Sequence, residues 1–191
     1  MTTNFIYLPT VMSEKKNVLA PFLLAFAGLK EGVHHFSRDI TNKFFDAFNY
    51  TEFNSAALFV EIDLTKKASM LEVRFAVSGN VCVSCDLTNE LFDLTLNPTH
   101  EFLVKFGGKF DDENEHLLII PHGSHHLDLA QTLFETIVLA VPQKKVHPGI
   151  EDGSLQSDLL DRLDKLHPGE SINESEITDP RWDVLKKLKK D

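Results

Sequence analysis

The chain has 191 residues, of which 42% are apolar, so it is long enough for one globular domain with appendages or for two small domains. A formal net charge of −10 argues against a protein that coats nucleic acid through its overall field, because neutralising phosphates needs clustered Lys and Arg. The same charge is compatible with a basic protein partner, or with RNA held at one local basic patch. Only two cysteines occur, which excludes a disulfide framework and favours a reducing compartment.

The N-terminal part contains an apolar run that resembles a secretory signal. Residues 18–29 follow two lysines and include an Ala-Phe-Ala string of the kind that signal peptidases cleave. The run is too short for a bilayer, which needs ~20 apolar residues, and it contains Pro21. We therefore expect a loose lead-in over residues 1–20, then a buried strand over 22–28, in a cytoplasmic protein that does not enter a membrane.

Several short segments alternate between apolar and polar residues, as half-buried strands do. Leu58, Val60 and Ile62 alternate with polar neighbours in the clearest case, residues 56–64. The strands expected are 22–28, 33–40, 56–64, 70–77, 81–85, 91–96, 101–106 and 117–121. Turns are expected at residues 78–80, 97–98 and 107–108, a short helix over 42–50, and a solvated acidic loop over 111–115. Short strands joined by tight turns predict a mostly antiparallel sheet.

Residues 127–142 carry the strongest helical pattern in the chain. Leu129, Leu133 and Ile137 recur at helical spacing, beside a second apolar stripe. Asp128 followed three residues later by Gln131 resembles a capping box, and a proline ends the run. The pattern predicts one long helix that is buried on most of its circumference. The fold class that follows is α+β: a mostly antiparallel β-sheet packed on this long buried helix, with short helices in a C-terminal tail.

The composition changes after residue 149. We expect a single α+β domain over residues 21–149, and an acidic linker with a helical tail over 150–191. Leucines at helical spacing predict a short charged helix over 155–166. Asp179 as a cap and Pro180 at the first helical position predict a terminal helix over 179–190.

No constellation of residues points to catalysis or to a cofactor. Cys82 and Cys85 have C-x-x-C spacing without a second pair, and on a strand they would point to opposite faces. His122, His125 and His126 cluster in sequence, and with Cys85 they supply an alternative interpretation, a metal-binding regulatory module. Their spacing matches no metal motif, so we predict no metal, no catalytic residue, no cofactor, no enzymatic activity and no small-molecule substrate.

The terminal helix carries the only dense basic patch in the sequence. The candidate partner-binding residues are Arg181, Trp182, Lys186, Lys187, Lys189 and Lys190. One interpretation is a solvated helix whose Trp182 docks on the domain. The other is an RNA contact, with the basic side chains on phosphates and Trp182 stacked on a base.

Five strings together resemble the YceD family of bacterial proteins, and are most similar to the flavobacterial type. They are FAGLKEGVHHF at 26–36, GNVCVSCDLTNELFD at 79–93, HLDLAQTLFETIVLAVP at 126–142, HPGIEDG at 147–153 and DPRWDVLKKL at 179–188. The resemblance covers most of residues 22–190, and none of the strings is a catalytic motif. Many relatives carry a cysteine pair near Cys85, but Thr88 stands here where the second cysteine would be, so their metal binding does not carry over.

The resemblance implies a cytosolic, non-enzymatic factor in large-subunit ribosomal RNA accumulation and ribosome biogenesis. Its expected partner is a ribosomal protein or pre-ribosomal RNA of the large subunit. The net charge favours the protein partner, whereas the lysine-rich end favours RNA.

Overall fold

The centre of the fold is a seven-stranded sheet. A computed structural model describes residues 18–114, 116–151, 155 and 158–166. The sheet has the order β2-β3-β4-β6-β8-β7, and β5 is an additional neighbour of β4. The strands are β2 (Gly32–Thr41), β3 (Ser55–Lys66), β4 (Met70–Ser84), β5 (Leu91–Leu96), β6 (Thr99–Gly107), β7 (Asp111–Asn114) and β8 (Leu117–Pro121). Neighbouring strands are antiparallel, except for β6 and β8, which are parallel.

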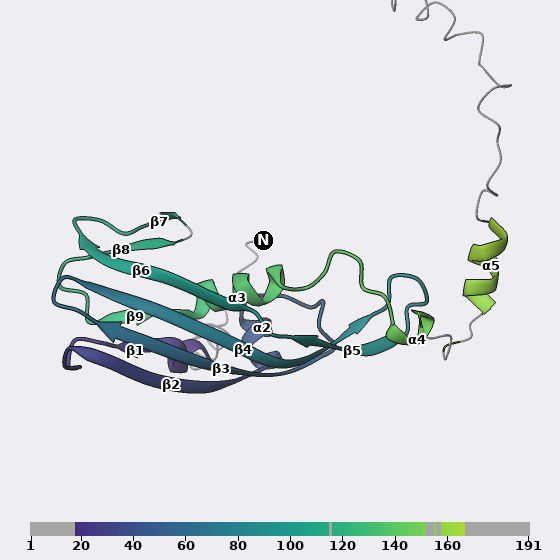
Figure 1. Ribbon diagram of the computed structural model, residues 1–191, viewed down its shortest axis with the longest axis horizontal. Helices are drawn as coiled ribbons and strands as arrows, with labels where there is room; N and C mark the ends of the chain where they lie inside the picture. Colours follow the sequence, from purple (N-terminus) through teal and green to yellow (C-terminus); the bar gives the residue numbers. More distant parts are fainter. Residues whose placement is uncertain (1–17, 115, 152–154, 156–157, 167–191) are drawn as a thin grey trace, which may run out of the picture.

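A smaller layer of short elements lies along one face of this sheet (Figure 1). It contains the 3₁₀-helix η1 (Ala20–Phe22), the antiparallel pair β1 (Leu23–Ala25) and β9 (His126–Asp128), and the helices α2 (Asn42–Ala47) and α3 (Ala130–Leu139). The helices α4 (Pro148–Glu151) and α5 (Asp158–Leu166) follow. None of the helices within the described residues is long and apolar enough to cross a bilayer.

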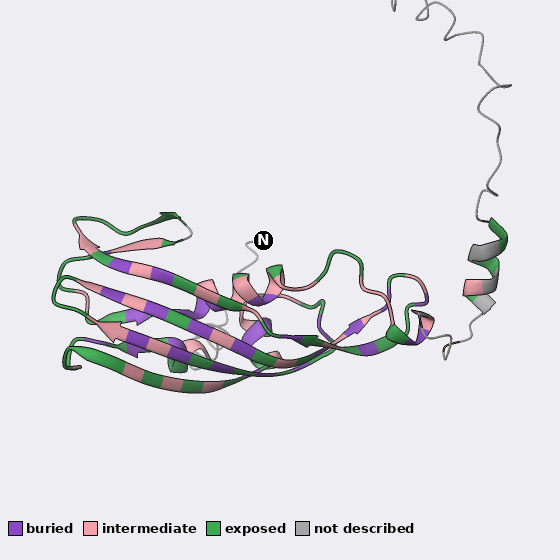
Figure 2. Cartoon of the chain, in the orientation of Figure 1, coloured by how far each residue is buried: buried purple, intermediate pink, exposed green. Residues whose placement is uncertain are grey.

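One hydrophobic core joins the two layers. In β3 the side chains of Val60, Ile62 and Leu64 are fully buried, while the alternate residues face solvent, as the banding in Figure 2 shows. Leu133 and Ile137 of α3 belong to the same buried cluster. The sheet therefore buries one face against the short elements and leaves the other face polar.

Aromatic rings connect α2 to α3. Phe45 of α2 packs edge-on against Phe53, with 4.9 Å between ring centroids, and Phe48 stacks on Phe134 of α3 at 4.4 Å. Such ring pairs stabilise beyond the area they bury, by about 0.5–1.5 kcal/mol each. The short helix expected in residues 42–50 is confirmed as α2, and the stack of Phe48 on Phe134 joins its C-terminal end to α3.

The expected α+β class with one long buried helix is wrong, because the protein is mostly β-sheet and its helices are short. Leu127 does not begin a helix: it lies in β9, opposite Leu24 of β1. Pairing with a strand more than a hundred residues earlier in the chain outweighs the local helical pattern here. The helix begins only at Ala130, whose N–H donates to Asp128 Oδ1 at 2.9 Å.

The expected burial of this helix is wrong as well. Within α3 only Ala130, Leu133 and Ile137 are buried. Gln131 does not complete a capping box, because its side-chain amide donates to Glu135 on the outer side of the helix. Leu139 is 83% exposed. The outer side of α3 therefore remains uncovered by the other described elements.

The expected turn at residues 78–80 is also wrong. β4 continues through it as a fifteen-residue strand, and Gly79 pairs with Leu58 of β3 on one side and Leu96 of β5 on the other. At this point the second neighbour of β4 changes from β6 to β5. Gly79 adopts φ +139°, so a turn signal in the sequence proves to be a bend inside a strand.

Two further expectations need correction. Most of the expected acidic loop, residues 111–115, is the exposed edge strand β7. The strand expected over 22–28 is shortened to β1, and the carbonyl groups of Phe26 and Leu29 beyond it accept hydrogen bonds from Lys66 Nζ, at 3.0 and 2.8 Å. The domain limits at residues 20 and 149 stay a prediction.

Candidate binding groove

A groove of about 910 Å³ lies beside the outer side of α3. We call it the acidic groove. Its lining comes from β1, from the β5–β6 turn, from β6 to β9 with their connections, and from α3: Leu23, Pro98, Thr99, His100, Phe102, Phe110, Asp112, Asn114, Leu118, Ile120, Pro121, Ser124, His126, Leu127, Asp128, Gln131, Thr132, Glu135, Thr136, Leu139 and Ala140. The groove exists because the short α3 covers only part of the inner sheet face.

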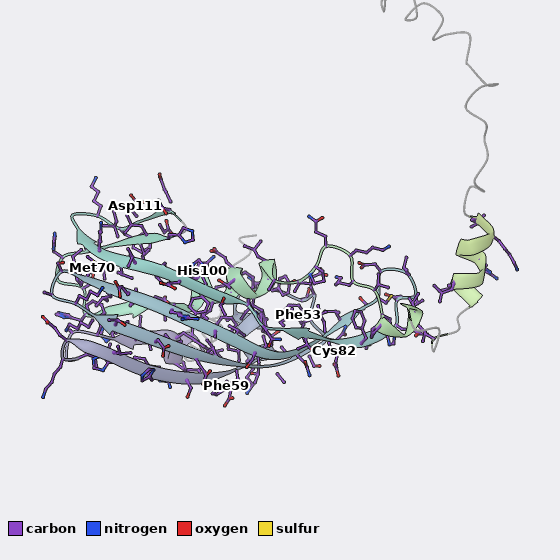
Figure 3. All side chains as sticks on the ribbon, viewed as in Figure 1. Phe53, Phe59, Met70, Cys82, His100 and Asp111 are labelled. Carbon is purple, nitrogen blue, oxygen red and sulfur yellow. The ribbon has the colours of Figure 1, made fainter. Side chains whose placement is uncertain are left out.

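The floor of the groove is apolar. It is built on the inward side chains of β6 and β8, among which Phe102 and Ile120 are nearly fully buried. His100, labelled in Figure 3, lies on β6, and its ring packs against those of Phe102 and His116. The floor can therefore accept apolar side chains of a ligand.

The rim carries exposed apolar side chains. Leu23 is 46% exposed, Phe110 is 59% exposed, and Leu139 is the most exposed large apolar residue of the described part of the chain. A soluble protein scatters such residues singly, whereas a group around one hollow is typical of an interaction surface.

The charge of the groove is negative. Asp112 of β7, Asp128 of β9 and Glu135 of α3 supply carboxylates, and none of the described lining residues is Lys or Arg. Apolar anchors next to carboxylates suit a partner segment that is apolar on one side and basic at its flanks.

The elements that form this groove lie almost entirely within a recognised family region. A family model described as large ribosomal RNA subunit accumulation protein YceD matches residues 73–189, more than half of the chain. The chain belongs to the YceD family. Comparisons with curated proteins and with solved structures found no significant match.

Membership associates the chain with ribosome biogenesis, through accumulation of the large-subunit ribosomal RNA. The family description names no catalysed reaction. The YceD match contains β6 to β9, α3 and residues 179–189 of the predicted terminal helix, but not β1. The flavobacterial subtype stays a prediction.

The structure describes only some of the sequence-derived candidates. Arg181, Trp182, Lys186, Lys187, Lys189 and Lys190 lie outside the described residues. His122 and His125 lie on the connection from β8 to β9, and His126 in β9 lines the groove. Among the described residues, no group of three or more His, Cys, Asp or Glu side chains is placed to hold a metal ion. The metal-binding alternative therefore has no site in this part of the chain.

In this YceD-family chain, a cluster of polar contacts lies just beyond the C-terminal end of β4 and joins Cys85 and Asp86 to Lys145 and His147. Figure 3 shows Met70 and Cys82 near opposite ends of this strand, and Cys85 follows its last residue. Cys85 is buried, whereas Cys82 is partly exposed, as strand alternation predicts. The Sγ atom of Cys85 accepts a hydrogen bond from the His147 backbone amide at 3.3 Å.

These contacts hold the segment before α4 against the turn that follows β4. The Lys145 amide donates to Asp86 Oδ2 at 2.6 Å, and the Asp86 amide donates to the Lys145 carbonyl at 2.8 Å. The ring of His147 packs against Phe92 of β5. The C-terminal part of the chain therefore leaves the domain from a fixed point near β5.

Hydrogen bonds control the ionisation of Cys85. Burial would raise the pKa of its thiol, but hydrogen bonds from the Thr88 hydroxyl and from the backbone amides of His147, Leu87 and Thr88 lower the pKa from 9.0 to about 7. Several donors favour the thiolate over the thiol in the folded protein. The pKa of the same thiol in the unfolded chain is close to the ordinary value.

This difference predicts a pH-dependent contribution to stability. Because the folded pKa lies below the unfolded pKa, the contribution is fully present above pH 9 and is lost as the pH falls to about 7. Urea unfolding of the native chain and of Cys85→Ser at several pH values measures it. The difference between their midpoints should widen from pH 7 to pH 9. A constant difference across this range would show that Cys85 does not ionise in this way.

Proposed function

We propose that this YceD-family chain promotes accumulation of large-subunit ribosomal RNA by holding a basic segment of a ribosomal protein in the acidic groove. The observation that carries the proposal is that the groove combines the exposed Phe110 and Leu139 with three carboxylates, while its described lining contains no Lys or Arg. The family description supports the process, and the chemistry of the groove supports a basic, partly apolar partner segment.

The chemistry of a ribosomal protein fits such a groove. Its RNA-binding segments carry Lys and Arg that neutralise phosphates, and before assembly these cations attract any nucleic acid nearby. Weak binding in the acidic groove holds such a segment until ribosomal RNA, with its higher charge density, displaces it. This role places the protein in the cytoplasm with the assembling subunit.

A second version rests on the C-terminal segment. There Arg181, Lys186, Lys187, Lys189 and Lys190 would contact phosphates, and Trp182 would stack on a base. The net charge of −10 favours the protein partner, because the field of the whole chain repels RNA.

Affinity purification from cells, with and without ribonuclease, separates the two versions. The first version predicts that a basic large-subunit protein stays bound after ribonuclease treatment. A variant in which the five basic residues of the C-terminal segment are changed to Gln should retain that protein. If association vanishes with ribonuclease and with these substitutions, the RNA version is correct and the groove is not the partner site.

A further inference from the structure

We propose that residues 179–190, in the chain's own C-terminal segment, occupy the acidic groove when no partner is bound. The inference goes beyond the proposed function, because it describes the free protein and does not depend on which partner later binds. The groove would then hold a segment of the chain itself, whose apolar and basic side chains resemble those expected of a partner.

The groove requires two features of its occupant. Phe110 and Leu139 stand more than half exposed at the rim, so an occupant must offer apolar side chains that cover them. Asp112, Asp128 and Glu135 require cations beside those apolar side chains.

Residues 179–190 offer both features in sequence. Five of these twelve residues are Lys or Arg, and Trp182, Leu185 and Leu188 recur at the spacing of one helix face. An isolated helix of this length is marginal in water, so the pattern itself calls for a docking surface. A Trp side chain is also among the most effective anchors for an apolar pocket.

The chain is long enough to bring the segment to the groove. The C-terminal part leaves the domain near β5, where the Leu155 amide donates to the Gly149 carbonyl at 2.8 Å. Ser84 of β4 pairs with Leu91 of β5, near the exit point, and Ala76 of β4 pairs with Thr99, which lines the groove. The eight residues of β4 between these two pairs correspond to a distance of about 26 Å. The nine residues of α5 add at most about 14 Å to this distance, and residues 167–178 can span up to about 40 Å when extended.

The single Trp of the chain makes the inference measurable, because all tryptophan fluorescence comes from Trp182. Acrylamide quenching should be compared between the full chain and a synthetic peptide of residues 176–191. We expect the quenching constant of the full chain to be several-fold lower than that of the peptide. It should also be independent of protein concentration, and it should rise towards the peptide value as salt is added.

Leu139→Lys is the decisive variant, with Leu91→Lys as its matched control. Leu139 is highly exposed and ends α3, where a cation suits the helix dipole, so the variant should fold. It should raise the quenching constant to the peptide value, and Phe110→Lys should do the same. Leu91→Lys, at an exposed position at the start of β5, should leave it unchanged.

Three outcomes would overturn the inference. The first is a full chain whose Trp182 is quenched as readily as the peptide. The second is protection of Trp182 that survives both Leu139→Lys and Phe110→Lys. The third is protection that appears only as protein concentration rises, because the occupant would then belong to a second copy.

Discussion

Replacing Gly79 by Ala should lower the free energy of unfolding by roughly 3 kcal/mol, or the melting temperature by about 10 °C. Gly79 has φ +139°, a conformation that costs a residue with a side chain about 1–3 kcal/mol. A Cβ atom at this position would also overlap the backbone carbonyl oxygen of Ala57 and come within 2.9 Å of the Leu58 Cα atom. Both belong to β3, so relief of the overlap requires two central strands to separate.

Gly28→Ala is the matched control for this prediction, because a Cβ there meets nothing within 4 Å. Thermal and urea unfolding followed by circular dichroism compare the two variants with the native chain. Gly28→Ala should stay close to the native stability. A Gly79→Ala variant as stable as Gly28→Ala would mean that β3 and β4 do not approach each other as described.

The double variant Phe110→Lys/Leu139→Lys should weaken binding of a basic amphipathic peptide by at least about tenfold. Both side chains lie on the rim of the acidic groove, so the substitutions remove apolar anchors and add two cations beside Asp112 and Glu135. The probe is a synthetic Leu-Lys peptide with leucines on one helix face. Fluorescence anisotropy of the labelled peptide measures the affinity.

Val33→Lys/Leu91→Lys is the control, because it adds the same charge at exposed apolar residues outside the groove. It should change the affinity only through the smaller net negative charge, an effect that disappears at high salt. Equal losses in the two double variants at all salt concentrations would show that the peptide responds to overall charge and does not bind in the groove.

The strands with clear alternation were predictable from sequence, whereas the ends of α3 were not. In β3 the residues Leu58, Val60 and Ile62 share one face whatever their neighbours are, because side chains alternate along any strand. The limit of α3 depends instead on Leu127, which pairs with Leu24. The local sequence pattern around Leu127 cannot reveal this pairing, because Leu24 lies far away in the sequence. The turn predicted at Gly79 was wrong for a related reason. The glycine is required there by the close approach of the β3 backbone, which the local sequence does not show.

The acidic groove was not predictable, because its parts come from distant segments. Leu23, Phe110 and Leu139 each read in sequence as an ordinary apolar residue, and only the fold groups them around one hollow. The short α3 leaves part of the inner sheet face uncovered, so the error in the length and burial of this helix also concealed the site. The basic C-terminal segment was visible in sequence because its residues are contiguous.

The most direct test of the central claim is the amount of large-subunit ribosomal RNA, relative to small-subunit RNA, in cells whose only copy of the protein carries Phe110→Lys/Leu139→Lys. Immunoblotting must first show that the variant accumulates to the native level. The groove account predicts that the ratio falls to that of cells lacking the protein, while Val33→Lys/Leu91→Lys retains the native ratio. A native ratio in cells carrying the groove variant would contradict the account.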